Sequence, residues 1–202
     1  ILRKKGRAVA AKREDREASE GCVLAKNEGN FAAILALKCE TDFVAKNAGF
    51  VELTTKLLDA AVANRIESIE ALNALEIDGR TVADLVIEET GKTGEKCEIG
   101  AYEFVVAPSV TSYVHFGNKL ATIAGFNQEG VDYQVGRDVA MQVASMNPVA
   151  VNRESVAASV VESERSIAID KSKEEQVKKA VEAALKKAGI NPNLCDSEDH
   201  IE

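Results

Sequence analysis

The sequence FAAILALKCETDFVAKNAGF, residues 31–50, contains a strand, a short connection and the start of a helix. Its apolar run FAAILALKC follows a shorter run, CVLAK, across an Asn-Glu-Gly-Asn turn, and this arrangement predicts a β-hairpin. Thr41 is placed to cap a helix, and Asp42 suits the first turn, where a carboxylate interacts favourably with the helix dipole. The apolar residues that follow recur at helical spacing and predict one helix from about Thr41 to Ala63.

Phe43 is the residue of this stretch whose environment the pattern leaves open. Adjacent helical positions lie about 100° apart, so Asp42 and Phe43 cannot both face the same core. Val44 and Val51 already suit the buried stripe of the helix. Phe43 is therefore either a further core residue or an exposed ring that fits a partner's pocket.

The composition is that of a soluble globular protein, with 202 residues, 46% hydrophobic and 29% charged. A formal net charge of −8 argues against nucleic-acid binding by bulk electrostatics. Four cysteines without a CxxC pair indicate reduced, structural thiols in a reducing compartment. The sequence has no apolar run near the ~20 residues of a membrane span and no secretory signal, so we expect a cytoplasmic protein.

Several further elements are predicted from local signals. Residues 1–20 predict a charged, exposed helix that ends at Gly21 and depends on a partner or another module for its packing. Two shorter helices are expected, one capped by Ser68 and one from Thr81 to Gly91. The run KCEIGAYEFVVA predicts a strand that stops before Pro108.

The second half repeats the order of hairpin and then helix. TSYVHFGNKLATIAGF predicts a hairpin with Gly117 and Asn118 at its turn. YQVGRDVAMQVASMNP predicts a helix ended by Pro148. Its expected apolar side consists of Val135, Val139, Val143 and Met146. The same order at 22–63 and 112–147 indicates two similar lobes.

We therefore predict an α+β fold of two small lobes, each an antiparallel sheet with helices, and a long helical or coiled-coil arm. The expected division is a linker helix at 1–20, a first lobe at 21–110, an incomplete second lobe at 111–150 and the arm at 151–202. The acidic end, CDSEDHIE, is expected to be mobile.

Sequence signals for catalysis are weak. The sequence contains no phosphate-binding loop of the form GxxxxGK[ST], no GxGxxG, no GxSxG and no HExxH. Its two histidines are His115 and His200, and Cys195 with His200 lacks a second ligand pair, so neither a metal site nor a cofactor is predicted. The basic residues at 3–16 favour a solvated helix face over a nucleic-acid site, because no aromatic residues are interleaved with them. Binding to the surface of another protein is therefore the favoured class of function.

Four segments resemble the translation elongation factor Ts family. TDFVAKN at 41–47 is similar to the signature of that family, and LRKKGRAVAAKREDREASEG at 2–21 resembles the end of its N-terminal module and the following linker. SYVHFGNKLATIAGF at 112–126 and RDVAMQVASMNP at 137–148 are similar to the second half of its core. The resemblance spans nearly all of residues 2–188. It implies a fragment without most of the N-terminal module and without the C-terminal part, so that the second sheet has an open edge.

The resemblance also implies a function and a set of site residues. It implies a guanine-nucleotide exchange factor that binds elongation factor Tu and promotes GDP release by disturbing the Mg²⁺ and phosphate site, without a cofactor, a metal or covalent chemistry of its own. The residues that would disturb this site are Thr41, Asp42, Phe43 and Val44. Other partner-binding residues would be Thr93, Gly94, His115, Met141 and Gln142, the last standing where histidine is common in the family.

Two other functions remain open at this point. A scaffold or chaperone-like protein would bind a partner without affecting nucleotide release. An RNA-associated accessory protein would bind RNA through residues 3–16 with strong salt dependence. A bacterial cytoplasm is favoured over an organelle because no transit peptide is visible, and a homodimer is left open.

Overall fold

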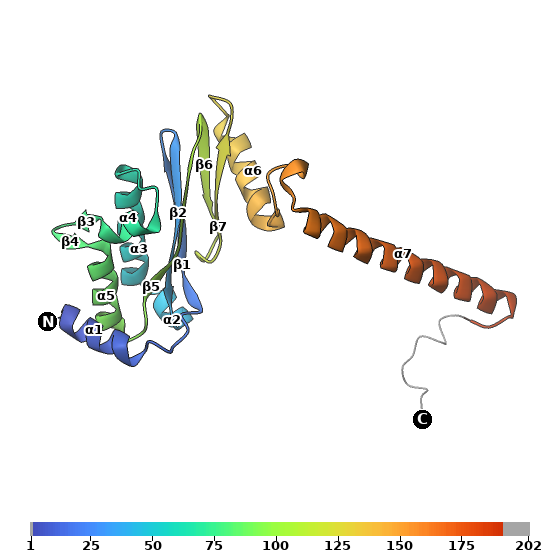
Figure 1. Cartoon of the computed structure of the whole chain (residues 1–202), viewed down its shortest axis with the longest axis horizontal. Coiled ribbons are helices and arrows are strands. Elements are labelled where there is room, and N and C mark those ends of the chain that lie inside the picture. Colours follow the sequence, from blue (N-terminus) through green and yellow to red (C-terminus); the bar gives the residue numbers. More distant parts are fainter. Residues whose placement is uncertain (1, 192–202) are drawn as a thin grey trace. The chain divides into compact units, whose positions relative to one another are not determined.

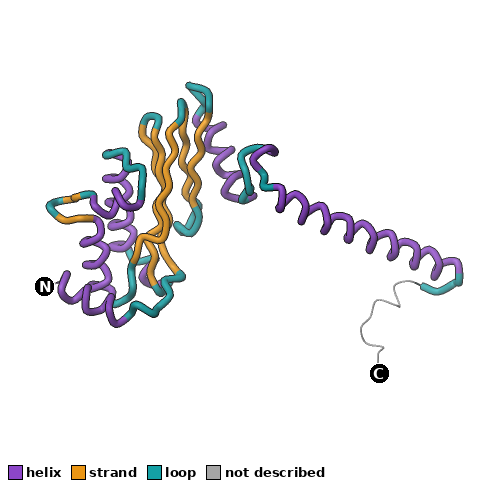
Figure 2. Tube along the Cα trace, in the orientation of Figure 1, coloured by secondary structure: helices purple, strands orange, loops and turns teal. Residues whose placement is uncertain are grey.

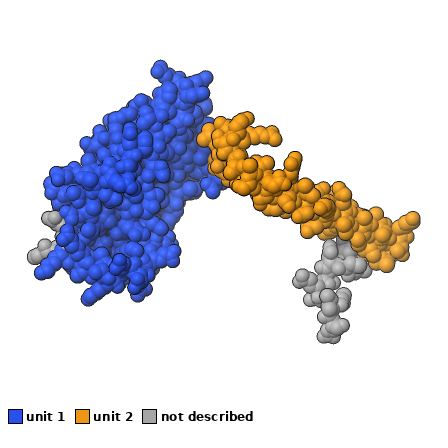
Figure 3. All heavy atoms as spheres, in the orientation of Figure 1, with its two compact units in different colours: residues 1–147 blue, residues 148–202 orange. Residues whose placement is uncertain are grey.

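The computed structural model describes residues 2–191 and has the predicted α+β architecture (Figures 1 and 2). The chain divides into two compact units, residues 1–147 and residues 148–202 (Figure 3). The division into linker, lobes and arm stays a prediction. The acidic end with Cys195 and His200 lies outside the described residues. Within residues 2–191, no helix is both long enough and apolar enough to cross a lipid bilayer.

The first unit is built on a three-stranded antiparallel sheet. Its order is β1 (Glu20–Glu28), β2 (Phe31–Cys39) and β5 (Glu98–Val106), so β2 is the central strand. This confirms the first hairpin and the strand that stops before Pro108. Gly21 lies in β1 against the carbonyl of Leu37, so the prediction that it ends a helix was wrong.

The central strand β2 is covered on both faces, which explains its nearly continuous apolar sequence. Helices α3 (Ala48–Ala63) and α5 (Val82–Thr93) cover one face, and a hairpin of β6 (Ser109–Val114) and β7 (Ala121–Phe126) lies on the other (Figure 1). Six of the nine β2 residues are buried. The largest fully buried side chains of the core are Phe31, Phe50, Leu35, Leu37, Leu57, Leu72 and Val82. Burial of such side chains is the main source of stability.

The helix predicted from Thr41 to Ala63 is two helices, and the prediction of one was wrong. Helix α2 spans Asp42–Ala45 and helix α3 spans Ala48–Ala63. Asn47 has an extended backbone, and its side chain accepts a hydrogen bond from the Gly49 amide at 2.9 Å, which starts α3 as a new helix.

The next segment contains the two expected helices and one hairpin that was not predicted. Ser68 caps α4 (Ile69–Ala74) as expected. The short strands β3 (Glu76–Ile77) and β4 (Arg80–Thr81) pair across Asp78-Gly79, where both residues have positive φ. Asp-Gly favours a two-residue hairpin turn, and this local signal predicts the hairpin that the expected elements did not include.

Thr81 caps α5 as predicted, but the predicted end at Gly91 was wrong. Helix α5 spans Val82–Thr93, and Gly94 ends it in the left-handed conformation with φ of 75°. Gly91 is buried within the helix. Both glycines match the C-cap signal, and only the second one has the required backbone conformation.

Helix α1 (Leu2–Lys12) packs on α5, which corrects the expectation of a helix with little to bury. Gly6 is buried at the contact, and a methyl group at this position would overlap the carbonyl of Ile87. The absence of a side chain at Gly6 therefore allows the two backbones to approach closely.

Helix α6 (Tyr133–Met146) follows the second hairpin, and it uses a different face from the one predicted. Its buried residues are Gly136 and Ala140, and a methyl group at Gly136 would overlap Thr111 of β6. Val135, Val139 and Met146 are exposed, with 73% of Met146 accessible. The apolar side of the helix is thus not the side that packs on the hairpin, because the close approach there requires small residues.

The second unit is helical, as predicted for the arm. A single turn of 3₁₀ helix at Arg153–Ser155 precedes α7, which spans Ala158–Lys187. Gly189, with φ of 74°, follows the helix. Helix α7 has no buried residue.

We expect Gly6→Ala to destabilise the first unit, although alanine is normally about 1 kcal/mol better than glycine inside a helix. Overlap with the Ile87 carbonyl should cost about 1–3 kcal/mol, because α1 and α5 must separate to admit the methyl group. Urea unfolding followed by circular dichroism measures this change. Lys5→Ala, at an exposed position of the same helix, is the control and should change stability by less than about 0.5 kcal/mol. A stabilising effect of Gly6→Ala would contradict the packing.

Candidate functional site: the exposed ring on helix α2

The candidate site begins where β2 ends. Only Glu40 and Thr41 separate Cys39, the last residue of β2, from helix α2. Thr41 caps α2 as predicted, with an extended backbone and a hydroxyl that accepts a hydrogen bond from the Val44 amide at 3.4 Å. The capped helix therefore leaves the sheet at a fixed point.

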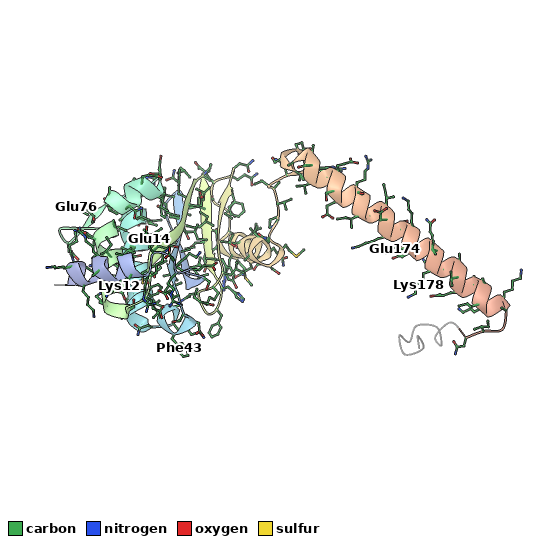
Figure 4. The ribbon with its side chains drawn as sticks, turned by 60° about the horizontal axis from the view of Figure 1, so that its bottom comes forward. Lys12, Glu14, Phe43, Glu76, Glu174 and Lys178 are labelled. Atoms are coloured by element: carbon green, nitrogen blue, oxygen red, sulfur yellow. The ribbon has the colours of Figure 1, made fainter. Side chains whose placement is uncertain are left out.

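Phe43 is exposed, which answers the question that its sequence environment left open. Its side chain is 84% accessible and points away from the protein (Figure 4). Ala45 is the buried residue of α2, and Val44 packs partly against the core. Because a single helical turn has room for one inward face, these two residues hold α2 and leave Phe43 outside.

Asp42 is paired within the same helix. Its carboxylate accepts a hydrogen bond from Lys46 Nζ at 2.7 Å, one turn away. This hydrogen bond and the charge of Lys46 lower the pKa of Asp42 below its ordinary value. Asp42 therefore presents a negative charge beside Phe43 at neutral pH.

A groove with a volume of about 460 Å³ lies beside the ring. Phe43 and Val44 line it from α2, and Glu89, Lys92 and Thr93 line it from α5. Thr93 is held at the end of α5 by its hydroxyl, which donates to the Glu89 carbonyl at 2.9 Å. The fold thus brings Thr93, and Gly94 after it, to the same side of the protein as the Phe43 segment.

The other predicted site residues lie on different elements and do not line this groove. His115 is exposed in the β6–β7 turn, and its Nδ1 lies 2.8 Å from the hydroxyl of Tyr113. Met141 and Gln142 are exposed on α6. Phe116, next to His115, is 97% accessible and was not singled out from the sequence.

Two glutamates that no sequence motif singles out hold the segment that precedes α2. Glu95 accepts hydrogen bonds from the backbone of Glu40 and Thr41, and Glu40 accepts one from the Lys96 amide at 2.7 Å. Glu40 also forms an ion pair with Arg13 at 2.6 Å. Burial alone would raise the pKa of Glu40, but the bonds from Lys96 and Arg13 lower it below its ordinary value.

Buried thiols lie directly behind the same segment. The Cys39 thiol donates to the Thr41 carbonyl at 3.2 Å, and Cys97 lies close enough to affect its ionisation. Burial raises the pKa of Cys39 to about 12 and that of Cys97 to about 11, and it also raises the pKa of Cys22. Both Cys39 and Cys97 are therefore neutral packing residues. Within residues 2–191, no group of three or more His, Cys, Asp or Glu side chains could hold a metal ion.

Comparison with known proteins agrees with the resemblance carried by the Phe43 segment. The family model described as Elongation factor TS matches residues 40–193. The chain is 58% identical over its whole length to Elongation factor Ts of Phocaeicola vulgatus and 55% identical to that of Parabacteroides distasonis. It belongs to the elongation factor Ts family.

The match covers only part of these relatives. The chain spans 61% of the length of both proteins. Elongation factor Ts of Porphyromonas gingivalis is 55% identical over 175 residues, which are 86% of this chain and 64% of that protein. The Phe43 segment, α5, the second hairpin and α6 all lie in the part that is shared with the family.

We expect Cys22, Cys39 and Cys97 to resist alkylation while this member of the family is folded. Burial keeps the thiols protonated and out of reach, so N-ethylmaleimide at neutral pH should modify them only after unfolding. Peptide mapping by mass spectrometry, with and without urea, measures this difference. Modification of Cys39 in the folded chain at the rate of free cysteine would contradict its placement behind Thr41.

The Glu40 contact should contribute to stability in a pH-dependent way. A carboxyl whose pKa is lowered by folding stabilises the protein above its unfolded pKa, here 4.5, and the contribution is lost as pH falls through the folded value. Glu40→Gln should therefore cost about 1 kcal/mol at neutral pH. Urea titrations of both proteins at several pH values should show this difference shrinking below pH 4.5. A difference that does not change with pH would show that the charge of Glu40 is unimportant.

Proposed function

We propose that this protein is a guanine-nucleotide exchange factor for elongation factor Tu in bacterial translation elongation. Membership of the elongation factor Ts family supports the class of activity, and the exposed ring of Phe43 beside Asp42 is the observation that carries the mechanism. The proposal includes a cytoplasmic location and a protein partner, not direct binding of nucleic acid.

In this proposal the Thr41–Val44 segment enters the GTPase domain of the partner near its Mg²⁺ and phosphate site. Phe43 inserts between partner helices, and Asp42 accepts hydrogen bonds or repels negative charge there. Thr41 caps the helix and Val44 anchors it, in agreement with the hydrogen bond and the partial burial described above. Thr93, which lines the other side of the groove, and Gly94 after it contact the same partner domain.

A second contact is assigned to the exposed residues of the second hairpin and α6. His115 in the turn and Met141 and Gln142 on α6 are accessible to a partner. The hydrogen bond between Tyr113 and His115 holds the imidazole in place. Gln142 can donate and accept hydrogen bonds, although it differs from the histidine that is common in the family.

The energetic basis of exchange is linkage between two ligands of the same protein. GDP is held through its phosphates by backbone amides and by Mg²⁺. An exchange factor that binds the distorted, Mg²⁺-free state of elongation factor Tu more tightly lowers the affinity of elongation factor Tu for GDP. GDP lowers the affinity of elongation factor Tu for the exchange factor by the same ratio. Each difference of about 1.4 kcal/mol changes these affinities tenfold. No covalent step and no cofactor are required of the exchange factor.

Phe43 is suited to this task because it is both exposed and held. Caps at both ends fix α2, so few conformations of the backbone are lost when the ring is buried by a partner. The ring can favour the distorted state only if its pocket is open there and closed when GDP is bound. Two basic side chains of the N-terminal segment form ion pairs within the protein, Arg13 with Glu40 and Arg7 with Asp84. These ion pairs weaken the case for the RNA-binding alternative.

We expect the chain to accelerate release of a fluorescent GDP analogue from bacterial elongation factor Tu in stopped-flow measurements. Phe43→Ala should lose about 2 kcal/mol of this effect, roughly thirtyfold in the second-order rate constant, because an exposed anchor ring contributes most where a partner buries it. Val106→Ala trims another exposed apolar side chain, 45% accessible on β5 and outside both proposed contacts, and is the control that should change the rate less than about twofold.

The outcomes separate the functions considered. Binding to nucleotide-free elongation factor Tu without faster release would favour the scaffold alternative. Equal rates for the parent chain and Phe43→Ala would remove Phe43 from the mechanism.

A further inference from the structure

Glu95 makes an unusual set of contacts for a residue outside the Phe43 segment. One of its oxygens, Oε2, accepts hydrogen bonds from the amides of Glu40 at 3.1 Å and Thr41 at 3.0 Å. The other, Oε1, accepts one from the Thr41 hydroxyl at 2.7 Å. A single carboxylate thus binds three donors in the two residues that connect β2 to α2.

Within residues 2–191, the two backbone amides among these donors have no other acceptor. Pairing of β2 with its neighbours ends at Cys39, and the amides of Glu40 and Thr41 precede the first hydrogen bonds of α2. Both residues are partly buried, so an unpaired amide would be costly here. Glu95 therefore holds the two residues through which the chain passes from the sheet into α2.

Glu95 is in turn fixed to the core helix α5. Its own amide donates to the Thr93 hydroxyl at 3.2 Å, and that hydroxyl donates to the Glu89 carbonyl at 2.9 Å. The Lys96 amide, next in the chain, donates to Glu40 at 2.7 Å. The two segments thus exchange hydrogen bonds in both directions, and α2 is connected to α5 through Glu95.

The Thr41 hydroxyl links this arrangement to the helix itself. It donates to Glu95 and accepts from the Val44 amide at 3.4 Å, so the contact with Glu95 holds in place the oxygen that caps α2. Phe43, at 84% exposure, has little packing of its own. The location of its ring is consequently set by the backbone of α2 and by the contacts that hold α2.

We propose that Glu95 is a positioning residue for Phe43: it sets the place and the direction in which α2 presents the ring to the partner. This inference rests on the proposed exchange function and extends it to a residue that touches neither the ring nor the 460 Å³ groove beside it.

If Glu95 acts by positioning, its hydrogen bonds should matter and its negative charge should not. In Glu95→Gln the amide oxygen can accept both backbone amides, and the amide nitrogen can donate to the Thr41 oxygen, so the arrangement survives without the charge. In Glu95→Ala both acceptor oxygens are lost, and with them all three hydrogen bonds. Glutamine should therefore restore most of what alanine removes.

The experiment measures GDP-analogue release from elongation factor Tu with the Glu95 variants in two backgrounds, with Phe43 and with Phe43→Ala. With Phe43 present, Glu95→Ala should slow release about tenfold and Glu95→Gln less than about threefold, because three hydrogen bonds are lost in the first and retained in the second. In the Phe43→Ala background, Glu95→Ala should cost less than about twofold, since a residue that acts through the ring has nothing left to position.

Two controls distinguish the loss of positioning from a general loss of stability. Val62→Ala, in the buried core of α3, should lower the melting temperature while leaving release within about twofold of the parent chain. Hydrogen exchange in the free chain, followed by NMR, should show the amides of Glu40 and Thr41 exchanging at least about tenfold faster in Glu95→Ala.

Each outcome has one meaning. Equal losses from Glu95→Ala in the two backgrounds, or unchanged protection of the Glu40 and Thr41 amides, would overturn the positioning role and leave the exchange function standing. An inactive parent chain would overturn the exchange function, and the positioning inference with it. A non-additive loss that glutamine rescues would support both.

Discussion

The double burial of β2 is the constraint on which the rest of the first unit depends. Helices cover one face of this strand and a hairpin covers the other. A shift in its register, or a rotation that swaps its faces, would therefore expose apolar side chains. Its end at Cys39 is therefore fixed relative to the core. The two residues that follow have to turn the chain away from the sheet, and the polar contacts around them are a consequence of that position.

In the candidate site, the residues that hold α2 in place are different from the residue that is exposed to a partner. Ala45 and Val44 pack inward, Thr41 caps, and Phe43 is left to the outside. A large apolar ring in water is unfavourable, and it persists here because the rest of α2 is secured independently of it. This division lets the ring interact with a partner without weakening the core that carries it.

Much of this could be predicted from sequence where a signal was local. The two hairpins, the caps at Thr41, Ser68 and Thr81, and the helical second unit each follow from a few neighbouring residues. What could not be predicted depended on contacts between distant segments. The pairing of Arg13 with Glu40 and of Glu95 with Thr41 spans 27 and 54 residues, and the exposure of Phe43 depends on how Val44 and Ala45 meet the core. The break at Asn47 was readable as a cap, but the helical period on both sides obscured it.

The packing of α6 has a consequence for how this molecule should be probed. The residues by which that helix meets its hairpin are already a glycine and an alanine, and its larger apolar side chains face outward. A conventional scan that trims side chains to alanine would therefore find α6 insensitive and rank it as unimportant to the fold. Only a scan that adds volume, at Gly136 or Ala140, would reveal the contact. The neighbouring strand packs closely against these small residues, so a larger side chain there would overlap it.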